Sequence, residues 1–205
     1  QEYGDSKVAL REKEFGIWQS VTWAGYCDHV KHFCLGLISL GLKPDDTVAI
    51  IGDNRPEWIY AELAAQAAGS KSVGIYQDSI AEEVFYIADY ADVSFLVVED
   101  QEQVDKVLEI LDDLPRLRSV VYYDPKGLRS YDHDILMHFP DVESLGRGYA
   151  DAHPNHFEEL VAEGNGEDIA LLGTTSGTTA KPKLAILTHD NMLGQAEAIM
   201  AVDPI

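Results

Sequence analysis

Basic residues are scarce in this sequence. Among its 205 residues, 15 are Lys or Arg and 36 are Asp or Glu, which gives a formal net charge of −21 at pH 7. A nucleic-acid-binding protein needs a basic surface to neutralise phosphates, so this overall charge argues against nucleic acid as a partner. A polyanionic ligand would have to be met locally, by backbone amides, a few lysines or a divalent cation.

Long apolar runs are missing as well, although 46% of the residues are hydrophobic. No stretch reaches the roughly 20 apolar residues that a membrane-spanning helix needs, so we expect no transmembrane segment. The first residues are polar and mixed in charge, unlike a secretory signal, and Gln1 stands where a complete chain would have Met. We therefore expect a cytoplasmic protein whose sequence is cut at its front.

Only two cysteines occur, Cys27 and Cys34, and they have His29 and His32 between them. If this segment is helical, Cys34 lies about 20° from Cys27, whereas the two histidines lie about 140–160° away on the opposite face. One metal ion cannot be bound by all four side chains in that geometry. We expect two buried, reduced cysteines in the core, as suits a cytosolic protein.

Apolar strands alternate with amphipathic helices through much of the sequence. We expect helices over residues 22–40, 54–69, 81–90, 101–113 and 156–163, and strands over residues 47–52, 72–76, 94–98 and 119–123. Thr22 is expected to cap the first helix and Asn54 the second, with Glu57 in capping-box spacing. This alternation predicts the α/β class, with a mostly parallel sheet and flanking helices. Residues 124–154 lose the pattern, and we expect an excursion with one or two short helices there.

The segment with the clearest chemistry lies between two apolar strands, residues 169–173 and 184–187, which are joined by TTSGTTAKPK. A Walker A loop would end in GK[ST] and open a helix, whereas this loop leads into a strand. No G-x-G-x-x-G follows any expected strand, so a Rossmann dinucleotide site lacks its residues. The segment therefore needs another explanation.

The composition of the loop suits a polyphosphate. Five hydroxyl side chains surround Gly177, whose backbone can approach a ligand closely, and Lys181 and Lys183 flank the rigid Pro182. Amide and hydroxyl donors beside two ammonium groups are suited to binding phosphates. A Ser/Thr-rich hairpin turn with two solvated lysines is the alternative that composition alone leaves open.

The order of the residues favours the first interpretation. TTSGTTAKPK strongly resembles the phosphate-loop signature of the adenylate-forming superfamily, a hydroxyl-rich S-G-T-T-G followed by one residue and P-K-G. LTHDN is similar to the usual continuation of that signature into a helix. ALREKEFGIWQSVTW, GLKPDDTVAIIGDNRPEW, GSKSVGIYQDS and LVVEDQEQVDKV resemble the opening of bacterial long-chain fatty acyl-CoA synthetases. Two positions depart from the signature, because Ala180 and Leu184 stand where the family has glycine.

The resemblance implies an AMP-forming acid–thiol ligase that uses ATP with Mg²⁺, a long-chain fatty acid and coenzyme A. It implies that Thr178 lies beside the Mg²⁺-bound phosphates and that Lys183 is the candidate catalytic residue. The residues implied to bind the β- and γ-phosphates are Thr175, Ser176, Gly177, Thr178, Thr179 and Lys183.

The resemblance covers only the front of such an enzyme. Residues 1–205 are expected to form part of its large N-terminal domain, with the phosphate loop at 174–184. The adenine-binding Y-G-x-T-E segment, the ribose-binding Asp, the hinge and the C-terminal lid have no match. We therefore expect a fragment that is inactive alone and whose full-length parent is the ligase. Another adenylate-forming ligase and a non-catalytic nucleotide-binding or interaction module are the alternatives. The resemblance leaves a homodimer and peripheral membrane contact open.

Overall fold

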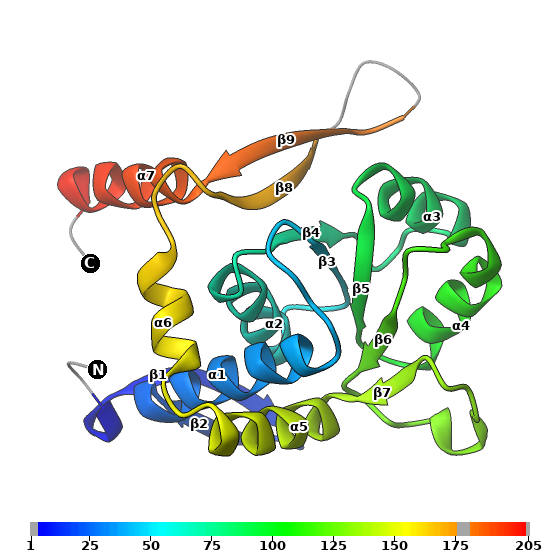
Figure 1. Cartoon of the computed structure of the whole chain (residues 1–205), viewed down its shortest axis with the longest axis horizontal. Helices are drawn as coiled ribbons and strands as arrows, with labels where there is room; N and C mark the ends of the chain where they lie inside the picture. Colours follow the sequence, from blue (N-terminus) through cyan, green and yellow to red (C-terminus); the bar gives the residue numbers. More distant parts are fainter. Residues whose placement is uncertain (1–3, 176–180, 204–205) are drawn as a thin grey trace.

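A computed structural model describes residues 4–175 and 181–203 (Figure 1). The helices are α1 (Trp23–Ser39), α2 (Pro56–Ala67), α3 (Ala81–Tyr90), α4 (Gln101–Glu109), α5 (Phe139–Ala152), α6 (His156–Glu163) and α7 (His189–Val202), with short 3₁₀ turns η1 (Gly4–Ser6), η2 (Leu111–Asp113) and η3 (Leu128–Ser130). The strands are β1 (Val8–Glu14), β2 (Ile17–Thr22), β3 (Thr47–Ile51), β4 (Lys71–Ile75), β5 (Val93–Val98), β6 (Ser119–Tyr122), β7 (Leu136–His138), β8 (Ile169–Thr175) and β9 (Lys183–Thr188).

A seven-stranded sheet forms the centre of the molecule, in the order β7-β6-β5-β3-β4-β8-β9. Every neighbouring pair in this sheet is parallel except β8 and β9, which run antiparallel. The strands β1 and β2 form a separate antiparallel hairpin. The α/β class and the mostly parallel sheet expected from the sequence are therefore confirmed.

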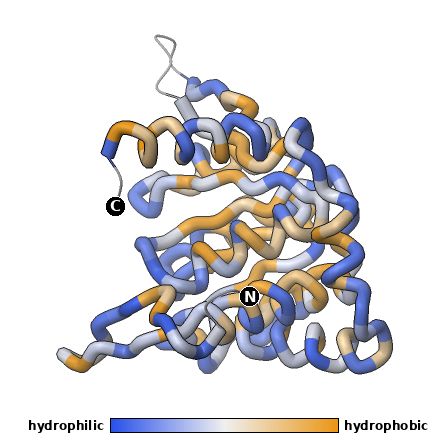
Figure 2. The backbone as a smooth tube through the Cα atoms, turned by 90° about the vertical axis from the view of Figure 1, so that its left-hand side faces the viewer, coloured by the Kyte–Doolittle hydropathy of each residue, from blue (hydrophilic) through white to orange (hydrophobic). Residues whose placement is uncertain are grey.

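Helices cover both faces of the sheet, and this explains why β3 and β5 are buried along their whole length. One face packs against α1, α2 and α5, and the other against α3 and α4. Figure 2 shows hydrophobic residues gathered in the central strands and hydrophilic ones in the peripheral turns. Within the described residues, no helix combines the length and apolar character needed to cross a membrane.

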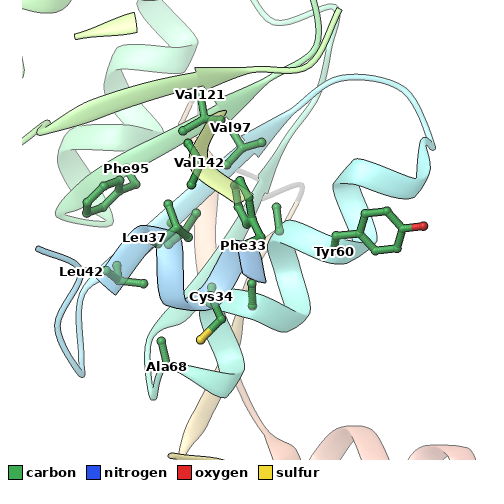
Figure 3. Packing of buried hydrophobic residues seen from close by; sticks show 14 of the residues in the cluster. Phe33, Cys34, Leu37, Leu42, Tyr60, Ala68, Phe95, Val97, Val121 and Val142 are labelled. Atoms are coloured by element: carbon green, nitrogen blue, oxygen red, sulfur yellow. The ribbon is translucent and has the colours of Figure 1, made fainter. Parts of the chain in front are cut away.

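Helix α1 lies at the centre of the helical layer that it forms with α2 and α5 on one face of the sheet. The Thr22 side chain accepts a hydrogen bond from the Gly25 amide at 3.1 Å, so the expected N-cap is confirmed. Phe33 of α1 stacks on Phe139 of α5, with ring centroids 3.9 Å apart. Leu37 points from the same helix toward the sheet (Figure 3).

The prediction of two core cysteines was half wrong. Cys34 is fully buried, and burial raises the pKa of its thiol to about 12, so it stays protonated. Cys27 is exposed. The stripe of α1 that carries both cysteines is buried only from Val30 onward, so helical phase alone does not reveal where burial starts.

The predicted cap at Asn54 was also wrong. Helix α2 begins at Pro56, and its N-cap is Arg55, which makes no side-chain capping bond. The ring of a proline disfavours helical backbone in the residue before it, and Arg55 is extended with φ −104° and ψ 159°. The proline therefore places the N-cap at Arg55, one residue beyond the candidate capping residue Asn54.

Residues 124–154 hold more structure than expected. They contain β7 and the 14-residue helix α5. Gly146 faces α1 so closely that a Cβ there would overlap the backbone carbonyl of His32. Gly36 of α1 meets the carbonyl of Val142 in the same way. Gly146 and Gly36 are therefore the residues that let α5 and α1 approach so closely.

Helix α5 is also tied to α1 by an ion pair. His29 Nδ1 lies 2.5 Å from Glu143 Oε1, and the His29 ring stacks on Tyr60 with centroids 4.6 Å apart. The hydrogen bond to the Glu143 carboxylate raises the pKa of His29, and partial burial opposes that rise. The folded chain therefore binds the His29 proton more tightly than the unfolded chain does.

This pair predicts a pH dependence of stability. It stabilises the fold fully below about pH 6.5, the ordinary histidine value. Its contribution is lost as the pH rises through the higher pKa of the folded state. We expect His29→Gln to flatten the fall in melting temperature between about pH 6 and pH 8. His133→Gln, at an exposed histidine for which the structure shows no ion pair, is the control. An unchanged slope in His29→Gln would contradict the prediction.

Candidate functional site

The candidate loop is carried by an antiparallel ribbon at one edge of the sheet. β8 pairs with β4 only at Ser72–Leu171 and Val73–Leu172, and its later residues pair with β9 alone. The far end of the ribbon therefore extends beyond β4, as Figure 1 shows at its upper right. The loop starts beyond the carboxyl end of β8, which is where open α/β sheets bind ligands.

Two of the six predicted phosphate-binding residues lie opposite each other where the ribbon opens into the loop. Thr175 ends β8 and Lys183 begins β9, and the two residues are paired in register. The Thr175 hydroxyl donates a hydrogen bond to the Lys183 carbonyl at 3.2 Å. The other four lie outside the described residues, namely Ser176, Gly177, Thr178 and Thr179.

The two lysines that flank Pro182 point to different sides of the ribbon. Lys181 Nζ lies 4.7 Å from the ring centroid of Tyr86, on α3. Leu184 packs toward the layer of α3 and α4. Successive strand residues alternate between faces, so the exposed Lys183 side chain leaves from the opposite face. Both lysines are exposed, and Lys181 is the one that lies against α3.

A hollow of about 630 Å³ separates the ribbon from α3. It is lined by Tyr76, Ser79, Glu82, Glu83, Tyr86, Ile87, Thr174, Thr175, Lys181 and Pro182. The α3 side of this hollow was missed from the sequence, because those residues come about 90 positions before the loop. Its two carboxylates would repel a bare phosphate chain, so the hollow suits an anion only together with a cation.

Thr178, the predicted Mg²⁺ contact, lies outside the described residues. In the described part of the chain, no group of three His, Cys, Asp or Glu side chains is placed to hold a metal ion. The hollow does offer the hydroxyl of Thr174 and the carboxylates of Glu82 and Glu83. Mg²⁺ binds in this manner, through one or two carboxylates plus substrate phosphates rather than a protein cage. The oxygen donors present are compatible with Mg²⁺ that arrives with a nucleotide.

The segment after β9 explains the LTHDN motif physically. Thr188 and Asn191 form a capping box, in which the Thr188 hydroxyl accepts from the Asn191 amide and the Asn191 side chain accepts from the Thr188 amide. The box starts α7 directly at the end of the ribbon. The expected continuation into a helix is confirmed.

A second hollow, of about 490 Å³, lies at the carboxyl ends of β3, β5 and β6. Arg55 contacts Glu12 of the hairpin at 2.6 Å and Glu99 at 3.4 Å, and Glu99 accepts the Asp53 amide at 2.6 Å. Burial, and then the charge of Glu99, raise the pKa of the Tyr123 hydroxyl that faces this hollow. These charges are paired with each other, so the cluster fastens the β1–β2 hairpin to the sheet.

A mostly parallel α/β sheet, whose antiparallel edge ribbon carries a hydroxyl-rich, lysine-flanked loop, agrees with the adenylate-forming class that the loop sequence resembles. Comparison with known proteins gives the same answer. The family model described as AMP-binding enzyme matches residues 1–204. The chain therefore belongs to the AMP-binding enzyme family.

The curated relatives are similar over nearly the whole chain. The long-chain-fatty-acid–CoA ligase ACSBG2 of Xenopus laevis is 32% identical over 196 residues, which cover 96% of this chain and 26% of that protein. The long-chain-fatty-acid–CoA ligase heimdall of Drosophila melanogaster is 30% identical over 188 residues, covering 90% of this chain and 27% of that protein. The chain thus spans about a quarter of the length of these relatives.

Solved structures support the fold. The anthranilate CoA ligase AuaEII, in complex with anthranoyl-AMP, superposes with a TM-score of 0.73 at 22% identity, covering 87% of this chain and 32% of that one. The acyl-CoA synthetase of Brucella canis gives a TM-score of 0.69 at 17% identity, covering 96% of this chain and 33% of that one. The order of elements found here is therefore shared with much longer ligases.

Proposed function

We propose that the protein to which this chain belongs is an ATP-dependent, AMP-forming ligase that joins a long-chain fatty acid to coenzyme A. The observation that carries the proposal is the TTSGTTAKPK loop at the tip of the β8–β9 ribbon, in a chain 32% identical to a long-chain-fatty-acid–CoA ligase. In this proposal residues 1–205 form part of the large N-terminal domain, and residues 174–184 are its phosphate loop.

The proposed reaction has two steps. A carboxylate oxygen of the fatty acid attacks the α-phosphorus of ATP, the bond to the bridging oxygen breaks, and pyrophosphate leaves with the electron pair. The thiolate of coenzyme A then attacks the acyl carbonyl, and AMP leaves. Mg²⁺ would supply charge neutralisation for the phosphates, with Thr178 as the candidate contact of this chain.

The role of this chain is to hold the phosphate chain while pyrophosphate departs. Thr175, Ser176, Gly177, Thr178 and Thr179 are proposed to surround the β- and γ-phosphates with hydroxyl and amide donors. Lys183, on the open face of the ribbon, is proposed to place its ammonium beside the leaving pyrophosphate. Such fixed donors accelerate a reaction because they stabilise the negative charge that develops in the transition state.

The test is fatty-acid-dependent exchange of labelled pyrophosphate into ATP by the full-length protein, followed by thioester formation with coenzyme A. We expect exchange with long-chain acids and much less with acetate or anthranilate. Exchange with an amino acid, or with long-chain acids but no transfer to coenzyme A, would favour another adenylate-forming ligase. ATP binding without exchange for any acid would favour the non-catalytic module. The 205-residue chain alone is expected to give no exchange.

The location and assembly of the protein belong to the same proposal. We propose a cytoplasmic protein, and the resemblance leaves open both peripheral membrane contact and a homodimer. Cell fractionation and light scattering of the full-length protein test these statements.

A further inference from the structure

Tyr86 of α3 contacts the C-terminal end of the candidate loop in two ways. Its hydroxyl donates a hydrogen bond to the carbonyl of Pro182 at 3.1 Å, and its ring lies 4.7 Å below the ammonium of Lys181. The two contacts use different parts of one side chain, the polar tip and the π face. The hydrogen bond joins positions that are 96 residues apart in the chain.

The hydrogen bond acts on the backbone immediately before Lys183. The Pro182 carbonyl belongs to the peptide group that also contains the Lys183 amide, and a peptide group is planar. On the other side, the Lys183 carbonyl accepts the Thr175 hydroxyl at 3.2 Å. Both peptide groups that flank the Cα of Lys183 are therefore fixed by side chains, one from α3 and one from β8.

The residue that provides the first of these bonds sits on a rigid support. Helix α3 is docked on the sheet by Val84, Ile87 and Ala88, all of which are buried. The Tyr86 ring also stacks on Tyr90 of the same helix, with centroids 5.7 Å apart. A functional side chain is aimed best when its own neighbours are held in this way.

We propose that Tyr86 is a positioning residue for Lys183. Its hydroxyl orients the peptide from which the Lys183 side chain starts, and its ring holds Lys181 on the α3 side, away from the face where Lys183 is exposed. The proposal rests on the proposed function, because it assigns Lys183 to the phosphates. Tyr86 would thus be a residue outside the loop that helps to orient the Lys183 ammonium.

The first experiment measures the anchoring itself and needs no activity. Hydrogen exchange of the full-length protein is followed by mass spectrometry in the peptides that span residues 181–188. We expect Tyr86→Phe, which removes only the hydroxyl, to speed exchange in this segment. Tyr90→Phe is the matched control, since Tyr90 stacks on Tyr86 and lies at the end of the same helix. Equal exchange in Tyr86→Phe and the unaltered protein would overturn the proposal.

The second experiment asks whether the anchoring acts through Lys183. We expect Tyr86→Phe to lower kcat of the adenylation half-reaction by about two- to tenfold, the worth of one net hydrogen bond. In a Lys183→Ala background the same change should have almost no effect, because the group being aimed is gone. A loss of equal size in both backgrounds would mean that Tyr86 acts independently of Lys183, and would overturn the proposal.

The two experiments also separate this inference from the proposed function. If the unaltered full-length protein adenylates no acid, the proposed function fails, and the hydrogen-exchange result still decides whether Tyr86 holds the segment. Tyr86→Leu removes both contacts and should speed exchange more than Tyr86→Phe. Its melting temperature is measured beside that of Tyr86→Phe, so that a general loss of folding is recognised.

Discussion

Replacement of Gly146 by alanine is expected to lower the melting temperature of the 205-residue chain by about 6–12 °C, because overpacking by about 3 kcal/mol shifts a chain of this size by that amount. The alanine Cβ would overlap the carbonyl of His32, so the clash is with backbone rather than with a flexible side chain. Helix α5 would have to lift from α1, which also separates Phe139 from Phe33 and Glu143 from His29.

Gly148 provides a matched control two residues further along the same helix. A Cβ at Gly148 meets no atom within 4 Å. Alanine is favoured over glycine in an open helical position by roughly 0.5–1 kcal/mol, so Gly148→Ala should raise the melting temperature slightly. Circular dichroism of the two variants measures both effects. If Gly146→Ala were also neutral or stabilising, the close contact between α1 and α5 would be disproved.

Strand β3 and helix α5 show where the sequence is informative about the fold and where it is not. The run TVAII predicts a strand covered on both faces, and the structure has β3 buried throughout, because such a run has only one comfortable environment. Gly146 and Gly148 weaken the helical pattern of residues 139–152, and nothing local tells that a second helix will lie against them. One or two short helices were expected in residues 124–154, and the full length of α5 was not predicted, because tertiary contact outweighs intrinsic propensity there.

The candidate site also has one part that the sequence predicts and one part that it does not. The order of hydroxyls, glycine and lysines in TTSGTTAKPK is enough to predict a phosphate-binding loop, because those residue types carry the chemistry themselves. The contact of Tyr86 with Pro182 was not predictable, since it depends on how α3 docks beside β8. The start of α2 follows a local rule instead, because Pro56 fixes the cap at Arg55 whatever the side chain of Asn54 offers.

The loss of the Lys183 ammonium is the second large effect that we expect. In the full-length protein, Lys183→Ala should slow the adenylation half-reaction by roughly ten- to a hundredfold. A charge-assisted contact to a phosphate is worth about 1.5–3 kcal/mol, and 1.4 kcal/mol corresponds to one decade in rate. The loss should appear mainly in kcat if the contact strengthens as pyrophosphate leaves, and mainly in KM for ATP if it is equally strong in the bound nucleotide.

Lys181→Ala is the control that the structure offers, since it removes an identical charge from the other side of Pro182. Its ammonium lies on the ring of Tyr86, so we expect a loss of less than about fivefold, in keeping with an exposed cation–π contact of about 0.5–1 kcal/mol. Adenylation has to be followed by pyrophosphate release in the absence of coenzyme A, because slow thioester formation would mask the difference. Equal and small losses in both variants would mean that the two lysines are solvated side chains at a turn, and that the phosphates are held by the hydroxyls and amides of the loop alone.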